Sequence, residues 1–449
     1  MKLCQKYKLE NDSLTNFDKF YVASLLFYIF LLPAEIIVAQ SSRVYLLWYF
    51  GARFMIAGVL MAFMLQQTMR GQSIKVNKGL LVMSYMFVLL AFLPSIHHQT
   101  TFILLRAFID FYLPYMFFLF YKKKYLSPLV NVATAFMFAM LVLAIIGFAY
   151  AFLGGPPIMT IFSRDGREYF WYLTTGAVTG GIIGNIIRPS GIYLEPSGLS
   201  FFTCVICFLR VFAKKNDVVT FGLFLLGMVT FSMTHMILFA LFILHLAVKY
   251  ITNKKLVLYV GAALLMTVAI YLPFREVVDE YLAFRFAVDE RTGQRQGDTR
   301  TNLVDNALGL LKSDYSFFFW GVPRDANGLS VLDREWGYGQ NPVEPVLKYG
   351  IFIAWLYYFY LAFFLLCAII DRKRFFIYLS ILLIFLPRPV FYKGAYVASI
   401  LILFCASSDL LKQRIKKIIS VYRNPIPNKC VIRHNIPIEN HKTKGDTNV

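Results

Sequence analysis

Long apolar stretches recur along this chain and are separated by short polar segments. A helix that crosses about 30 Å of hydrocarbon needs roughly 20 mostly apolar residues, and such windows fill most of the sequence. The pattern therefore predicts an all-α polytopic membrane protein with about twelve transmembrane helices. The expected spans lie near residues 20–39, 45–65, 79–96, 101–120, 129–153, 192–212, 218–232, 234–250, 255–273, 349–370, 375–388 and 391–408.

Residues 218–250 are the part of this pattern that can be divided in two ways. They are long enough for two short spans in a tight hairpin, with a turn predicted at Ser232–His235. If they formed a single span, every later loop would change sides.

Clusters of lysine and arginine occur at every second gap between the expected spans. They lie at 2–19, 70–78, 122–124, 214–215, 249–255, 372–374 and from 412 onward. Short loops that remain in the cytoplasm are enriched in these residues, so the alternation places both termini in the cytoplasm. It predicts a cytoplasmic N-terminus at 1–19, a transmembrane domain at 20–408 and a basic cytoplasmic tail at 409–449.

The composition agrees with this class of protein. Hydrophobic residues make up 58% of the chain, charged residues only 16%, and the formal net charge is +20. Anionic headgroups attract basic residues at the cytoplasmic face, so nucleic-acid binding is not needed to explain the charge. The tail is expected to be a membrane-surface segment, with a nucleic-acid or regulatory arm as the alternative. The polar start runs directly into a full-length span, so no cleavable signal peptide is expected.

The six cysteines give no indication of a disulfide or of a metal centre. None lies in the two large loops between expected spans. Cys204 and Cys207 have zinc-like spacing, but they lie inside an apolar span without a second ligand pair, so core packing is the preferred interpretation. We predict no metal site and no cofactor.

Two long polar segments, 154–191 and 274–348, interrupt the hydrophobic rhythm on the non-cytoplasmic side, where function is expected. Within the second, Leu303, Ala307, Leu310 and Leu311 recur at helical spacing and predict an amphipathic helix over Thr299–Ser313. Basic residues in both segments are mostly arginines, whereas lysine dominates on the other side. Guanidinium groups hold phosphate oxygens in a bidentate manner, so these arginines favour a phosphorylated lipid headgroup as ligand. The alternative is that they pair with acids of their own loop.

The segment from Arg188 to Glu195 contains the most informative single residues. Its sequence, Arg-Pro-Ser-Gly-Ile-Tyr-Leu-Glu, is followed by Pro196, and it opens an expected span. Its proline and glycine residues predict irregular backbone near membrane depth, which is tolerated only where it lines a cavity. Arg188 is expected to project into that cavity. A carboxylate there is costly unless it is used or paired, so Glu195 is expected either to act in acid-base chemistry or to pair with an arginine.

The order of these features resembles the bacterial O-antigen polymerase (Wzy-type) and O-antigen ligase superfamily. The resemblance covers roughly residues 180–410. It rests on the Arg188-Pro-Ser-Gly191 element followed by Glu195-Pro196, on two short spans, and on a long outer loop. In that loop it rests on the following elements: Arg291, Arg295 and Arg300, the helix around Asn302–Leu311, Phe319-Trp320-Gly321-Val322-Pro323, and Gly339-Gln340-Asn341 ahead of Gly350.

The resemblance implies an inverting, metal-independent glycosyltransferase of the membrane-embedded, GT-C-like type. It would lie in the bacterial inner membrane with its active site facing the periplasm. Its substrate would be a polyprenyl-pyrophosphate-linked oligosaccharide, and a chain-length regulator is an expected partner. The product would be O-antigen, capsule or exopolysaccharide.

The resemblance also implies roles for individual residues. Glu195 and Arg188 would be catalytic, with Glu195 as the base. The residues expected to hold the pyrophosphate or glycan are Arg285, Arg291, Arg295, Arg300, Gln340 and Asn341.

Two other functions stay open at this point. A ligase would transfer the glycan to lipid A core, but ligases carry a His-Asn pair where this chain has Gly339-Gln340 or Gln340-Asn341, and the missing histidine argues against a ligase. A non-enzymatic transporter or flippase of lipid-linked sugars predicts inverted repeats, and the sequence shows no such symmetry.

Overall fold

The computed structural model describes a mostly helical chain. The described residues are 14–33, 51–69, 76–99, 104–105, 108–162, 168–178, 182–183, 186–250, 261, 265, 272, 275–276, 279, 299–323, 332, 341–386 and 394–423.

The helices and strands follow one another along the chain in four groups. The first is helical: α2 (Asn16–Leu26), η1 (Phe27–Leu31), α4 (Ala52–Met69), α5 (Lys78–His97), η4 (Phe108–Tyr112), α7 (Leu113–Phe118), η5 (Lys123–Tyr125) and α8 (Leu126–Phe152). The second is a group of strands: β1 (Met159–Phe162), β2 (Glu168–Tyr172), β3 (Thr175–Val178), β4 (Ile182–Ile183) and β5 (Ile186–Ile187). The third comprises α9 (Pro196–Phe212), α10 (Asp217–Gly227), η7 (Met228–Thr230) and α11 (Met233–Tyr250). The last comprises α14 (Thr299–Ser313), α15 (Ser316–Trp320), α17 (Glu344–Tyr349), α18 (Ile351–Ile370), η9 (Arg372–Arg374), α19 (Phe375–Phe385) and α20 (Gly394–Arg423).

Among the described residues, five helices are long and apolar enough to cross a membrane. They are Lys78–His97, Lys123–Phe152, Met233–Tyr250, Ile351–Ile370 and Gly394–Lys416. Shorter apolar helices lie at Phe108–Phe118, Pro196–Phe212 and Asp217–Thr230. These helices indicate a polytopic membrane protein. Every predicted span except 255–273 overlaps a helix, and 255–273 lies almost entirely outside the described residues, so the count of twelve stays a prediction.

Helix α9 forms the centre of the bundle. It is apolar on nearly all sides, and all but one of its residues, Ser197, are buried. It packs against α8, α10, α11 and α20, so no side of the helix is left for solvent or lipid. A helix that is hydrophobic all round is stable only when it is surrounded in this way.

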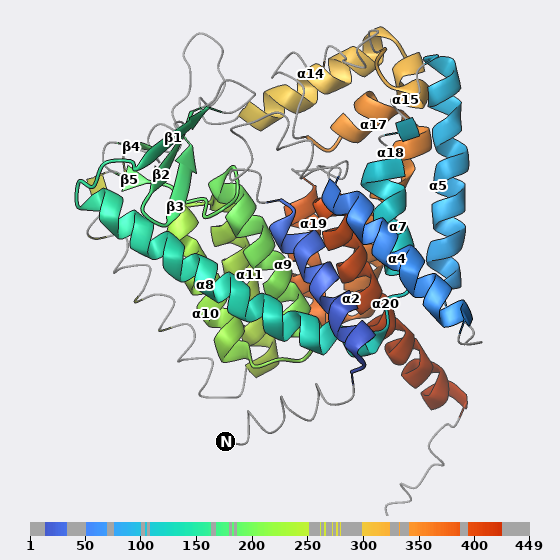
Figure 1. Cartoon of the computed structure of the whole chain (residues 1–449), viewed down its shortest axis with the longest axis horizontal. Helices are drawn as coiled ribbons and strands as arrows, with labels where there is room; N and C mark the ends of the chain where they lie inside the picture. The colour runs from blue at the N-terminus through green and yellow to red at the C-terminus, as the bar shows by residue number, and fades with distance from the viewer. Residues whose placement is uncertain are drawn as a thin grey trace, which may run out of the picture.

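The bundle has two unlike ends (Figure 1). Strands β1–β5 and helices α14 and α15 lie at one end, which we call the loop end, and α14 runs across the top of the bundle in this view. The C-terminal end of α20 and the start of α2 lie at the opposite end, which we call the basic end. The strands of the first predicted loop and helices α14 and α15 of the second therefore lie at the same end of the bundle.

Three buried aspartates at the basic end are each held by cations. The Lys124 and Lys249 ammonium groups lie 2.5 Å from the carboxylates of Asp18 and Asp217. Asp371 accepts from two arginines, Arg374 at 2.5 Å and Arg414 at 2.8 Å. A tyrosine hydroxyl completes two of the clusters, from Tyr125 to Asp18 and from Tyr250 to Asp217. These basic residues lie at one end of the bundle, in agreement with the predicted alternation of basic clusters between spans. That this end faces the cytoplasm stays a prediction.

The first loop contains a small sheet that the sequence analysis did not predict. Strands β1, β2 and β3 form an antiparallel meander, and β4 pairs with β5. The sheet rests on the C-terminal part of α8 at Gly147. A Cβ there would lie 2.5 Å from Thr175 Cγ2 and 2.7 Å from the Tyr172 carbonyl oxygen, so only glycine permits this approach. Aromatic residues fill β2, Glu168–Tyr172, which is typical of a strand with one packed face.

The hairpin after α9 confirms two helices over 218–250 but corrects the predicted turn. The chain reverses at Phe231, which has a left-handed backbone with φ +47°, and α11 already begins at Met233. The turn predicted at Ser232–His235 was therefore placed too late. His235 is a buried residue of α11, and its ring hydrogen-bonds to a neighbouring helix. The residues around it in the sequence do not reveal this contact.

Candidate functional site

The segment from Arg188 to Glu195 is irregular, as predicted, and it is held in place by the adjacent sheet. The backbone N–H of Ser190 donates to the Gly176 carbonyl over 2.8 Å, and the N–H of Gly176 donates to the Gly191 carbonyl over 3.0 Å. The N–H of Gly191 also donates to the Thr175 hydroxyl over 2.9 Å. Gly191 has φ +60°, and a Cβ there would lie 3.0 Å from Met140 Cε of α8. The segment therefore lies between β3 and α8.

Tyr193 fixes the other side of this segment. Its hydroxyl donates to the Phe30 carbonyl over 3.0 Å, and its ring stacks on Phe202 at 4.9 Å. Phe30 belongs to η1, a π-helical turn, and such turns are frequent at functional sites. Because the partner lies 163 residues away in sequence, the backbone of the segment is fixed by tertiary packing.

Glu195 occupies the N-cap position of α9. Its backbone is extended, with φ −136° and ψ +148°, and Pro196 follows at the first helical position. The half-buried carboxylate accepts from the Ser197 hydroxyl over 2.9 Å and makes no capping bond to the helix backbone. The positive end of the α9 dipole lies beside it and stabilises negative charge there. The carboxylate is thus positioned by its own helix.

Arg188 lies at the start of the same segment and contacts the hairpin between α10 and α11. Its Nε donates to the Thr230 carbonyl over 3.4 Å, and the side chain is half-buried. Thr230 is itself buried and donates through its hydroxyl to Gly227 over 2.9 Å. The structure thus brings Arg188 to the top of the hairpin that packs against α9.

His235 of α11 hydrogen-bonds to α9 and α10, so it joins the helix that begins after Glu195 to the hairpin that contacts Arg188. Its Nε2 lies 2.8 Å from the Phe224 carbonyl, which can only accept, so Nε2 carries the proton. Its Nδ1 then accepts from the Ser200 hydroxyl at 3.1 Å, with Cys204 Sγ at 3.4 Å. Glycine at 227 leaves room for the ring, because a Cβ there would overlap it. Cys204 is part of the buried core of α9, as the sequence analysis preferred.

The second loop contains the predicted amphipathic helix, and α14 spans Thr299–Ser313 as expected. Its apolar side packs in a small cluster with residues of α15 and α17. The buried members are Ala307, Val322, Leu332 and Leu347, and Leu310, Leu311, Phe317 and Val343 pack against them. Arg300 lies in the first turn of α14.

Asn341 is almost fully buried and has a structural role in this fold. Its Oδ1 accepts from the N–H groups of Val343 and Glu344 at 2.8 and 3.0 Å. Its Nδ2 donates to the Leu303 carbonyl over 3.3 Å, one turn after Arg300. The side chain therefore caps α17 and joins it to α14, and these bonds account for asparagine at this position without a ligand.

The other residues predicted for the site, Arg285, Arg291, Arg295 and Gln340, lie outside the described residues, as does the side chain of Arg300.

Glu344 is a buried acid beside Asn341 that was not among the predicted site residues. Its carboxylate pairs with Lys348 at 2.8 Å, and both side chains are nearly inaccessible. Glu344-Pro345 begins α17 as Glu195-Pro196 begins α9. That repeated Glu-Pro pair ahead of an apolar helix was the signal available in the sequence.

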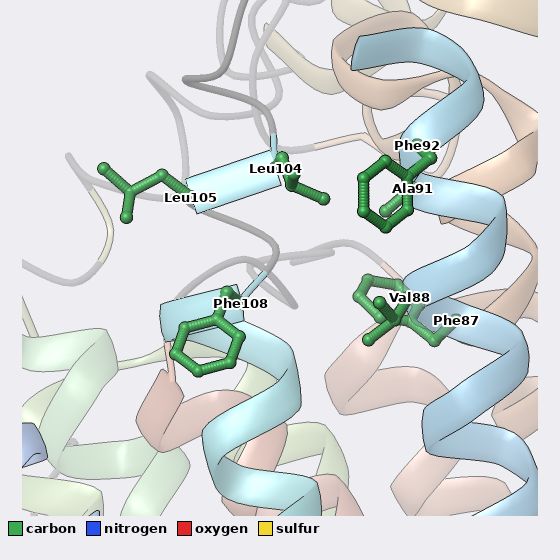
Figure 2. A pocket seen from close by; sticks show the side chains of 7 residues that line it. All are labelled: Phe87, Val88, Ala91, Phe92, Leu104, Leu105 and Phe108. Carbon is green, nitrogen blue, oxygen red and sulfur yellow. The ribbon is translucent and has the colours of Figure 1, made fainter. Parts of the chain in front are cut away.

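A separate cavity of about 380 Å³ lies between α5 and the residues around η4 (Figure 2). Seven apolar side chains line it, among them Phe87 and Phe92 of α5 and Leu104, Leu105 and Phe108 across from them. Such a lining fits hydrocarbon and offers no group for acid-base chemistry. We therefore do not place the candidate site there.

Within the described ranges, His, Cys, Asp and Glu side chains form no group of three that would hold a metal ion. Comparison with known proteins gives no match to a family model, to a curated protein or to a solved structure.

Proposed function

We propose that this protein is a polysaccharide polymerase that joins polyprenyl-pyrophosphate-linked repeat units at the periplasmic face of the bacterial inner membrane. The observation that carries the proposal is the Arg188–Glu195 segment. It is irregular backbone at the head of a buried apolar helix, it lies at the loop end, and it holds a guanidinium and a carboxylate. Irregular backbone within a membrane protein is tolerated where it is buried in protein or lines a water-filled cavity, and the proposal takes this segment to line such a cavity.

The proposed reaction is an inverting displacement at the anomeric carbon of the donor sugar. The bond from that carbon to the pyrophosphate oxygen breaks, and a bond to the acceptor hydroxyl oxygen forms. Arg188 stabilises the negative charge on the departing lipid pyrophosphate. Glu195 accepts the proton of the attacking hydroxyl. No metal ion is needed in this scheme, because the guanidinium groups supply the positive charge.

The placement of α14 supports the same proposal. This helix lies across the loop end (Figure 1). Arg300 is in its first turn, three residues before Leu303, whose carbonyl accepts from the Asn341 amide. In the proposal, Arg300 and the arginines that precede it in the sequence supply further positive charge to the pyrophosphate. Arginine is suited to this because it remains charged when it is partly desolvated.

The test is the glycan ladder on cells that lack the gene and carry a variant in its place. Arg188→Ala should shorten or abolish the ladder, because loss of one charge-stabilising donor lowers a rate by about 10²- to 10³-fold. Arg188→Lys should give an intermediate ladder, and Glu195→Gln should remove the proton acceptor while preserving the side-chain volume. The matched control is Arg275→Ala, since Arg275 is an exposed arginine that pairs with Asp279.

Equal amounts of each variant in the membrane fraction are required for the comparison. A wild-type ladder from both Arg188→Ala and Glu195→Gln would refute the proposed site. The deletion strain itself distinguishes the functions: loss of a polymerase leaves single repeat units on the acceptor, loss of a ligase leaves none, and loss of a flippase traps units inside the cell.

A further inference from the structure

Helix α15, Ser316–Trp320, presents aromatic side chains on the outside of the protein. The exposed fractions are 41% for Phe318 and 48% for Phe319, and the preceding Tyr315 is 74% exposed. The helix is nevertheless fixed to the bundle, because Val322 donates to the Leu347 carbonyl over 2.7 Å and Phe317 packs in the cluster with α14. Exposed apolar side chains that gather in one place typically mark a surface that meets a membrane or another protein.

The position of α15 along the bundle indicates what that surrounding is. Trp320 stacks on His97 at 4.5 Å, and the Nε2 of His98 lies 2.9 Å from the Trp320 carbonyl oxygen. His97 is the last residue of α5, which is long and apolar enough to cross a membrane. The ring of Trp320 also lies 5.2 Å from Phe352 in the first turn of α18, another such helix. Helix α15 therefore sits at the level where two candidate spans end.

The apolar surface of α5 leads to the same place. Leu89, Leu93 and Ile96 are exposed at helical spacing toward the end of this helix, as expected for a surface that faces lipid. Helix α15 lies beside the upper end of α5 (Figure 1). Its exposed aromatic residues thus lie next to this apolar surface, and helices that lie in the membrane interface carry Trp, Phe and Leu on their apolar face.

We propose that α15 is a membrane-interface anchor whose Phe318 and Phe319 side chains insert between the lipid headgroups and acyl chains at the loop end. Asp314 links the anchor to α14, since its carboxylate accepts from the N–H of Ser316 over 2.8 Å. The anchor therefore holds α14 at a fixed height above the bilayer. This inference concerns a surface remote from Arg188 and Glu195, and it stands whether or not the protein is a polymerase.

The test uses a fluorescent bimane label on single introduced cysteines in proteoliposomes. Cys204, Cys207, Cys367 and Cys405 are buried and are retained, whereas Cys4 and Cys430 are replaced by serine. The labelled variants are Phe318→Cys and Phe319→Cys, and the matched control is Asp305→Cys on the exposed side of α14. Quenching is measured with lipids brominated near the carbonyl end of the acyl chain and with aqueous iodide.

Labels at 318 and 319 should lose about half of their fluorescence in brominated lipid and respond weakly to iodide, as expected for side chains at the acyl boundary. The label at 305 should show the opposite behaviour. Using two positions guards against a local disturbance from either substitution. If both labels are quenched by iodide as strongly as the label at 305 and are insensitive to brominated lipid, the anchor proposal is wrong.

Discussion

Replacing Gly350 with alanine should separate α15 from the junction between α17 and α18. Gly350 has φ +69° and ψ +166°, a region of backbone conformation that is essentially restricted to glycine. An added Cβ would overlap the Phe319 carbonyl group and would lie 2.8 Å from the carbonyl carbon of Trp320. The clashing atoms belong to the backbone, so a side-chain rotation cannot relieve them.

Gly321 faces Gly350 across this contact and has the same kind of conformation, with φ +81° and ψ +172°. A Cβ on Gly321 would lie 3.0 Å from the Gly350 nitrogen. The backbone of α15 therefore approaches the start of α18 as closely as two glycines permit. Alanine at 350 must displace α15, adopt another backbone conformation, or do both.

The expected magnitude follows from the conformational cost. Forcing a non-glycine residue into this region costs about 1–3 kcal/mol. Since 1.4 kcal/mol is a factor of ten in an equilibrium constant, local opening of the contact should become roughly 5- to 150-fold more frequent. The overlap with Phe319 adds to this cost, so the range is a lower bound.

The assay is amide hydrogen exchange in lipid nanodiscs. The N–H groups of Gly321 and Val322 report directly, because they donate to Phe317 and Leu347 at 2.9 and 2.7 Å. Peptides over 317–323 should exchange faster in Gly350→Ala. In the matched control, Gly309→Ala, the added methyl group meets nothing within 4 Å, so this variant should leave exchange unchanged or slow it. Unchanged exchange over 317–323 in Gly350→Ala would refute the reasoning.

Two further predictions concern single polar side chains. Burial would raise the pKa of Asp18, but hydrogen bonds from Lys124, Tyr125 and Thr15 outweigh it and lower the pKa from 3.8 to about 2. Because the folded-state pKa is depressed, the stabilisation by Asp18 should be complete above about pH 4 and disappear as the pH falls toward 2. In thermal unfolding in detergent at pH 3 to 7, the native protein should therefore have a higher Tm than Asp18→Asn, and this difference in Tm should shrink as the pH falls. A difference in Tm that is the same at every pH would contradict the prediction. Asn341→Ala should destabilise α17 by about 0.5–2 kcal/mol through loss of its cap. Asn341→Asp keeps the oxygen that accepts from Val343 and Glu344 but loses the amide that donates to the Leu303 carbonyl, so it should recover only part of the stability. A glycan ladder that is lost in Asn341→Asp while the protein is as stable as the native one would instead assign the amide to substrate binding.

Much of the local architecture could be read from the sequence. The amphipathic spacing of Leu303, Ala307 and Leu310 predicted α14 with its bounds, since a helix of that length shows its period in a short window. The prolines and glycines around Arg188–Glu195 predicted irregular backbone ahead of α9, and the structure confirms it. The turn after α10 was predicted too late in the sequence. The polar residues Ser232, Thr234 and His235 are typical of a turn, and the sequence alone does not tell whether they face water or pack against neighbouring helices.

The candidate site was only partly accessible to sequence reasoning. Arg188 and Glu195 were predicted because a charge within an apolar context is unusual, and their role stays a prediction. Asn341 was predicted to hold glycan or pyrophosphate, and this stays a prediction; the structure adds the contacts of its side chain with Val343 and Glu344, which the sequence did not indicate. Glu344 was missed, because an acid in a polar loop is unremarkable until packing against Lys348 and α18 buries it.

The sequence by itself determined that this chain is a helical membrane protein, and it determined where most of the helices lie. Both properties follow from hydropathy and period, which are summed over neighbouring residues. Only the tertiary structure decided which distant groups meet: Tyr193 with Phe30, His235 with Ser200, and Trp320 with His97 and His98. Such contacts depend on the angles at which helices pack and on where glycine allows close approach, and neither is encoded within one short stretch of chain.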